Sequence, residues 1–192
     1  MKVVLGLVCA AVALGAGAAT AGTTQDDPWA GLRRPLHLPH IKAGHTCPAS
    51  RGGGQSGGQT LYGRGPVYLI GLQGTSKATV GIGDSARDAL GWYGQKTPWA
   101  ITRSYTGPIL VRGARIGRKG RVHGPKGQMR FAYGYGAHLK ELHWESGADQ
   151  GLPPDPNFRF LASASLFRRT GCYAYQIDGT SFSEIVVARV GD

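Results

Sequence analysis

The chain has 192 residues, a formal net charge of +11 at pH 7 and a hydrophobic content of 41%. The length indicates one domain, and the hydrophobic content excludes an intrinsically disordered chain. The positive charge indicates an affinity for polyanions but carries no information about the fold.

Residues 1–21 have the features of a secretory signal peptide. Lys2 precedes an apolar run that ends at Leu14, and a small-residue cleavage site ends at Ala21. The run is shorter than the ~20 apolar residues that a membrane-spanning helix requires. We therefore expect cleavage after Ala21 and a protein that is secreted or associated with the cell envelope, without a transmembrane segment.

Two cysteines, Cys47 and Cys172, lie outside the predicted signal peptide. In an exported chain two thiols most simply form one disulfide bond, and two free buried thiols are the alternative. Neither cysteine has a second ligand at a zinc-binding spacing, so we expect no metal site at these positions and no cofactor.

The segments that follow the signal peptide are rich in proline and glycine. We interpret the polar residues 22–33 as a flexible leader. Residues 33–41, "RRPLHLPHI", alternate leucines with polar residues, a short strand pattern that two prolines would confine to a sheet edge. Residues 51–65 contain seven glycines and predict a flexible loop.

The rest of the chain has the pattern of short strands separated by glycine-bearing turns. Helical periodicity is confined to residues 84–93, and 32 glycines disfavour a helical protein. The clearest pair is a C-terminal hairpin with Asp178 and Gly179 at its turn. The predicted strands cover residues 66–72, 98–102, 108–112, 128–133, 138–144, 155–167, 172–177 and 182–190. This pattern predicts an all-β, single-domain antiparallel β-sandwich over residues 34–192.

Four blocks of the sequence resemble those of a family of exported bacterial proteins of unassigned function: "RRPLHLP", "GRGPVYLIG", "QKTPWAITRSYTGPILVRG" and "GCYAYQIDGTSFSEIVVARV". The last block is similar to the final hairpin of many bacterial immunoglobulin-like sandwiches, in which Gly-Cys opens the penultimate strand. The resemblance covers about half of the mature chain. It implies an immunoglobulin-like β-sandwich and an exported protein, and it implies no activity.

Residues 101–130 hold eight of the 22 lysines and arginines and no acidic residue. Several glycines and Pro125 would break a strand or helix, so we predict an exposed basic loop over residues 112–126. Such a loop would bind anionic polymers through charge, without preference for a nucleic acid sequence. The alternative is a solvated loop that only keeps the protein soluble. The candidate polyanion-binding residues are Arg112, Arg115, Arg118, Lys119, Arg121 and Lys126.

Three polar residues in "KELHWES" would share one face of a strand: Glu141, His143 and Glu145. Two carboxylates and an imidazole in one place could bind a metal or transfer a proton. The alternative is the solvent-exposed face of an ordinary sheet.

Two serines lie in motifs that are similar to those of hydrolases. Ser85, in "GDSARD", resembles the nucleophile of Gly-Asp-Ser esterases, but the chain has no Asp-x-x-His to supply a base. Ser56, in "GQSGG", resembles the chymotrypsin-like nucleophile, but Gln55 replaces the aspartate and too little chain precedes it. We expect neither serine to be catalytic.

Four aromatic residues lie close together in the sequence: Trp92, Tyr93, Trp99 and Tyr105. If they are exposed they would stack on sugars or bases beside Lys96, and if they are buried they belong to the core.

These observations predict a secreted, non-catalytic β-sandwich that binds an anionic cell-wall polymer or polysaccharide through the basic loop. One alternative is a hydrolase of envelope polymers that uses Glu141, His143 and Glu145. Another is a protein-binding or inhibitor module that works through an edge strand or its loops. The sequence leaves the ligand and the oligomeric state open.

Overall fold

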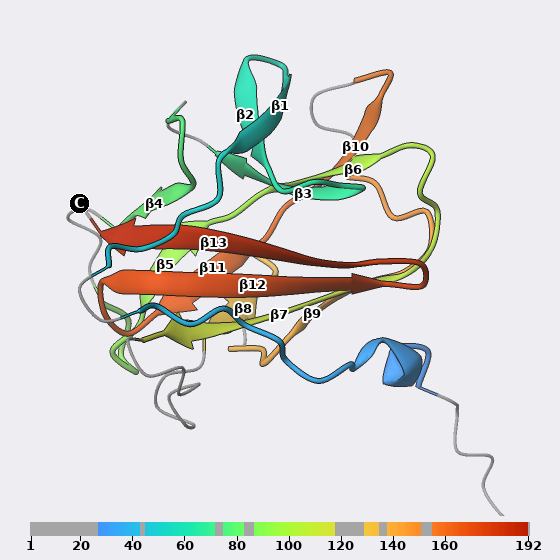
Figure 1. Cartoon of the computed structure of the whole chain (residues 1–192). Helices are drawn as coiled ribbons and strands as arrows, with labels where there is room; N and C mark the ends of the chain where they lie inside the picture. The colour runs from blue at the N-terminus through green and yellow to red at the C-terminus, as the bar shows by residue number, and fades with distance from the viewer. Residues whose placement is uncertain are drawn as a thin grey trace, which may run out of the picture.

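A computed structural model describes residues 27–42, 45–71, 75–82, 87–117, 129–134, 138–150 and 155–191 (Figure 1). The predicted signal peptide lies outside these residues. Within them the chain forms thirteen strands and one short 3-10 helix, and no helix there is long and apolar enough to cross a membrane. The elements are η1 (Ala30–Leu32), β1 (Gly52–Ser56), β2 (Gln59–Tyr62), β3 (Val67–Gly71), β4 (Thr79–Gly81), β5 (Tyr93–Lys96), β6 (Trp99–Thr102), β7 (Ile109–Ile116), β8 (Arg130–Ala132), β9 (Leu142–Trp144), β10 (Phe158–Leu161), β11 (Ala164–Phe167), β12 (Gly171–Gly179) and β13 (Ser183–Gly191).

The first layer is a five-stranded sheet in the order β4-β13-β12-β7-β9. β12 lies at its centre, antiparallel to β13 and β7, and β4 joins one edge parallel to β13. Side chains alternate along β12, because successive residues of a strand point to opposite faces. Tyr173, Tyr175 and Ile177 therefore face the second layer, while Cys172 and Ala174 face away from it.

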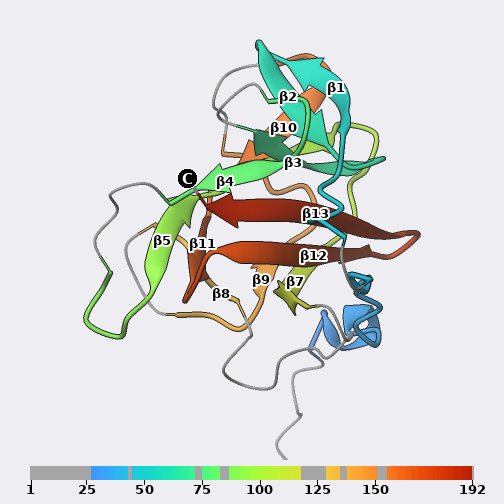
Figure 2. The ribbon, with the colours of Figure 1, turned by 60° about the vertical axis from the view of Figure 1, so that its left-hand side comes forward.

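The second layer contains two sheets, β1-β2-β3-β6-β10 and β5-β11-β8, which continue into each other (Figure 2). Two residues separate β5 from β6, and two separate β10 from β11. At this break the Thr97 N–H donates to the Ser163 carbonyl at 2.8 Å, so the two long segments remain paired through it. Strands that pass from one sheet to the next at a bend are a common way to form the corners of β-sandwiches.

Large aromatic side chains fill the space between the layers. Trp99 on β6 is fully buried and lies edge-on to Tyr175 on β12, with 5.5 Å between the ring centroids. Phe131 and Phe167 are fully buried in the same cluster. The predicted all-β antiparallel sandwich is confirmed, and Trp99 belongs to its core, where aromatic rings contribute much of the buried area.

Residues 34–42 and 45–47, here called the strap, run across the outer face of the first layer (Figure 1). Leu38 and Ile41 pack on an apolar cluster that includes Ala174. The strand predicted over residues 33–41 is wrong, because the strap crosses β12 and pairs with no sheet edge. Its prolines lack the N–H groups that a ladder of hydrogen bonds requires.

The predicted disulfide bond is confirmed. Cys47 at the end of the strap is bonded to Cys172 on β12, with 5.5 Å between the Cα atoms. The bond fastens the strap to the central strand of the first layer.

The glycine-rich residues 51–65, predicted to be a flexible loop, instead form the hairpin β1–β2. Gly57 and Gly58 lie at its turn with φ values of 54° and 76°. A two-residue hairpin turn of this kind requires positive φ at both positions, which glycine adopts without strain. Leu61 and Tyr62 are buried and anchor β2 against β3. The prediction is wrong because glycine content indicates only the conformational freedom of the unfolded segment. Pairing of β2 with β3 removes that freedom in the folded protein.

Two further boundaries differ from the sequence prediction. β7 continues to Ile116, so Arg112 and Arg115 belong to a strand and the loop predicted from residue 112 is wrong over residues 112–116. β9 is shorter than the predicted strand over residues 138–144.

The predicted Asp-Gly turn of the last hairpin is displaced by two residues. Asp178 and Gly179 lie inside β12, and the Gly179 N–H donates to the Phe182 carbonyl at 3.0 Å, so Thr180 and Ser181 form the turn. Gly179 is required by packing, since a Cβ there would lie 2.2 Å from the ring of Phe182.

Candidate anion-binding groove

The structure places the described residues of the predicted basic loop in two different environments. Arg112 and Arg115 point to opposite faces of β7, because they are three residues apart on a strand. The predicted residues Arg118, Lys119, Arg121 and Lys126 lie outside the described residues.

Arg112 is bound inside the protein. Its guanidinium donates to the Asp178 carboxylate at 2.7 Å and to the Arg34 carbonyl at 2.5 Å. The Asp178 side chain is fully buried, and it also accepts a hydrogen bond from Ser183 at 2.7 Å. Arg112 therefore neutralises a buried carboxylate and holds the start of the strap. Arg115, on the inner face, donates to the Thr170 carbonyl at 3.3 Å.

Cationic side chains gather elsewhere, around a groove of about 740 Å³ on the outer face of the β5-β11-β8 sheet. Small residues make this face hollow: on β11, Ala164 lies opposite Lys96 on one side and Ala132 on the other. One wall is the turn that precedes β5. The lining residues used below are Arg87, Asp88, Trp92, Lys96 and His138.

Trp92 forms one wall of the groove and positions two arginines. It is only 5% exposed, because the Arg168 guanidinium lies over its ring at 4.4 Å from the centroid and that of Arg130 at 5.8 Å. The His138 ring packs against it edge-on at 5.9 Å. Contacts of guanidinium groups with an indole face are attractive, so the ring holds positive charge beside the groove.

Asp88 is the one carboxylate that lines the groove among the described residues, and both of its oxygens already have partners within the protein. One of its oxygens accepts hydrogen bonds from the backbone N–H groups of Leu90 and Trp92, both at 2.9 Å, and the other lies 2.9 Å from His138 Nε2. The N–H of Trp92 is the main cause that holds the pKa of Asp88 below its ordinary value. The carboxylate therefore shapes the turn of residues 88–92 and remains charged at neutral pH.

Positive charge exceeds negative charge at the groove. Arg87, Lys96 and Arg168 form no ion pair with any carboxylate of the described residues. Most other described carboxylates form ion pairs away from the groove: Asp27–Arg33, Glu141–Arg33, Asp149–Arg103, Asp178–Arg112 and Glu184–Arg64. A concave surface with unmatched cations attracts anions.

The structure brings together two of the three polar residues predicted to act together in "KELHWES". Glu141 Oε1 lies 2.8 Å from His143 Nε2, whereas Glu145 is exposed and is not part of this contact. No group of three histidine, cysteine, aspartate or glutamate side chains within the described ranges could hold a metal ion.

The leader covers Glu141 and His143. Trp29 stacks on the His143 ring with 4.6 Å between centroids, and the Arg33 guanidinium donates to Glu141 at 2.9 Å. Residues 27–33, the described part of the predicted flexible leader, thus form a turn and η1, which is anchored by the buried Leu32. The predicted flexibility fails here because side chains distant in sequence bind the segment.

We expect acid to release the leader. Partial burial acts to raise the pKa of Glu141, but hydrogen bonds from Arg33 and His143 outweigh it and lower the pKa. Glu141 therefore stabilises the docked leader fully above its ordinary pKa of ~4.3. This stabilisation is lost as the pH falls through the lowered pKa of the folded protein. The fluorescence difference between the wild type and Trp29→Phe should change in this range while the far-ultraviolet circular dichroism stays constant. In Glu141→Gln this change of fluorescence with pH should be absent. A fluorescence difference between the wild type and Trp29→Phe that does not vary with pH would contradict the prediction.

Ser56 has a structural partner. Its hydroxyl donates to Asp155 at 2.5 Å, and Asp155 also accepts the backbone N–H of Asn157 at 2.8 Å. The pair fastens the end of β1 to the start of β10. Ser85 lies outside the described residues.

Together these features define the class of the protein as an all-β sandwich with one disulfide bond, a strap across one face and a basic groove. Comparison of the chain with protein-family models, curated protein sequences and solved structures found no match. The sequence did not predict the groove because its cations come from separate segments: Trp92 and Lys96 belonged to the aromatic cluster and Arg130 to the basic stretch, and no pattern joined the two.

Proposed function

We propose that the protein is an exported, non-catalytic β-sandwich that binds anionic polymers of the cell envelope in the groove beside Trp92. The observation that carries this proposal is that Arg87 and Lys96 line a groove of about 740 Å³, while the guanidinium groups of Arg130 and Arg168 lie over Trp92 in its wall. Export and an immunoglobulin-like relationship belong to the proposal and rest on the sequence patterns alone.

The chemistry of the groove supports a polymer as the ligand. A chain of repeated anionic units can contact several cations at once and displace the counterions around each of them. The basic residues Arg118, Lys119, Arg121 and Lys126 precede Arg130 closely in the sequence, and we propose that their charge adds to the same attraction.

The enzymatic alternative receives less support. Glu141 is paired with Arg33 and His143 is stacked on Trp29, so the leader restricts the access of a substrate to both side chains. The lowered pKa of Glu141 also makes it a poor proton donor at neutral pH.

The groove proposal predicts a change in salt dependence. Replacing Arg87, Lys96 and Arg168 together by glutamine should lower the affinity for heparin more than ~10-fold at ~50 mM salt and flatten its decrease up to ~300 mM, because fewer counterions are released. Isothermal titration calorimetry across this range measures both quantities. A change of tryptophan fluorescence on binding that is absent in Trp92→Phe reports binding at the groove itself, because the chain has four tryptophans.

A matched control removes equal charge elsewhere. Arg51, Lys77 and Arg189 are exposed and do not line the groove, so their triple replacement by glutamine should have a much smaller effect. Equal losses of affinity in the two triple variants would overturn the groove proposal and would assign the binding to net charge alone.

A further inference from the structure

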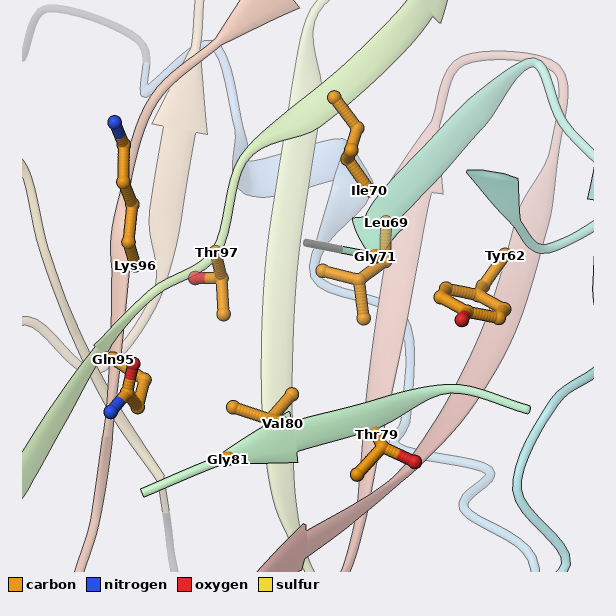
Figure 3. A pocket seen from close by; sticks show the side chains of 10 residues that line it. All are labelled: Tyr62, Leu69, Ile70, Gly71, Thr79, Val80, Gly81, Gln95, Lys96 and Thr97. Atoms are coloured by element: carbon orange, nitrogen blue, oxygen red, sulfur yellow. The ribbon is translucent and has the colours of Figure 1, made fainter. Parts of the chain in front are cut away.

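A second, smaller cavity adjoins the groove at β5. Its volume is about 50 Å³, and it lies between β3, β4 and β5 (Figure 3). Gln95 and Lys96 line both this cavity and the groove. The two hollows therefore share β5, and a chain that leaves the groove across the edge of β5 would reach the cavity.

The edge of β5 offers backbone contacts between the two hollows. Within the described part of the chain, β5 pairs with β11 alone, so its other edge is not part of a ladder. An edge strand presents N–H and C=O groups that can bind the hydroxyl or amide groups of a ligand. This favours a polyhydroxylated chain over a lipid surface.

The size of the cavity limits what can enter it. One water molecule needs a cavity of about 10–15 Å³ on the same measure, so a volume of about 50 Å³ has room for a group of a few atoms. A small substituent of the polymer is a group of this size.

The walls of the cavity favour a small, neutral and partly apolar group. Leu69 and Val80 point toward each other and supply apolar surface (Figure 3). The hydroxyls of two polar lining residues are already bonded inside the protein: that of Tyr62 lies 2.5 Å from the Thr75 carbonyl, and that of Thr97 lies 2.9 Å from Ser165.

We propose that the ligand of the groove is an acidic polysaccharide whose sugars carry acetyl groups, and that one acetyl group enters the cavity beside Val80. The inference rests on the proposed function and names the ligand class of the same site. The cations of the groove select the acidic groups of the chain, and the cavity selects the acetyl methyl.

Alginate tests the inference, because acetylation of its hydroxyls leaves one carboxylate on each sugar. Burial of one methyl group corresponds to about a fourfold gain in affinity, so acetylated alginate should bind at least that much more tightly than the unmodified polymer. Val80→Leu and Val80→Phe add bulk to the cavity wall, and both should abolish this preference while retaining the affinity for unmodified alginate. Lys96→Gln should weaken the binding of both polymers to a similar degree.

The outcomes separate the two proposals. Equal binding of both polymers by the wild type, or a preference that persists in folded Val80→Leu protein, would overturn the cavity assignment and leave the groove intact. Absence of salt-dependent binding to either polymer would overturn the proposed function. Thermal unfolding of each variant shows that the compared proteins are folded, and the milder leucine substitution provides the test if phenylalanine prevents folding.

Discussion

Replacement of Arg112 by leucine is expected to lower the free energy of unfolding by about 3 kcal/mol, because it leaves the buried Asp178 carboxylate without its closest cation. The remaining partners do not compensate fully: Arg34 lies 3.7 Å from Asp178, and Ser183 supplies a neutral hydrogen bond. Urea denaturation measures the loss. Heparin affinity and its salt dependence should remain those of the wild type, since Arg112 is bound inside the protein.

A second substitution tests the cause of this loss. Arg112→Leu/Asp178→Leu removes both charges, and apolar residues of similar size often replace a buried ion pair without loss of stability. The double variant should therefore be more stable than Arg112→Leu. Arg168→Gln, which alters an exposed cation at the groove, should show the opposite behaviour, with nearly unchanged stability and weaker binding. If Arg112→Leu kept its stability but lost affinity, Arg112 would be a ligand-binding residue, as the sequence alone predicted.

Removal of the disulfide bond should also have a large effect. The bond joins residues 125 positions apart, and closure of such a long loop restricts the unfolded chain. Cys47→Ala/Cys172→Ala is expected to lower the free energy of unfolding by about 2–5 kcal/mol. The strap would then be held by Arg34 at its start, by hydrogen bonds such as that from the His37 N–H to Gln176 at 2.8 Å, and by the packing of Leu38 and Ile41. Chemical denaturation of the oxidised wild type and the double variant measures the difference.

Reduction provides the control for the disulfide prediction. Wild-type protein treated with a phosphine reductant should approach the stability of the double alanine variant, whereas the variant itself should not respond. No residue of the groove belongs to the strap, so folded variant protein should retain its heparin affinity. A stability equal to that of the wild type would show that the strap and its disulfide contribute little to the fold.

Several errors of the sequence prediction have one physical origin. Asp178 and Gly179 form a dipeptide that favours a turn, yet Arg112 binds the aspartate and the ring of Phe182 requires the glycine. Residues 51–65 have the composition of a flexible linker, yet pairing with β3 orders them. In both cases contacts with distant residues outweigh a local preference.

The sequence by itself determined the all-β class, the disulfide bond and most of the long strands. These depend on alternation along a few residues, on glycine content and on the number of cysteines, which are local or compositional properties. Only the tertiary structure decided which cations share a surface. Lys96 and Arg130 lie near the same groove because β5 and β8 both pair with β11. Arg112, also in the basic segment, lies on β7 of the first layer, points away from the second layer and binds Asp178 on β12. Strand pairing brings together residues far apart in the chain, and no local pattern specifies the partner strand.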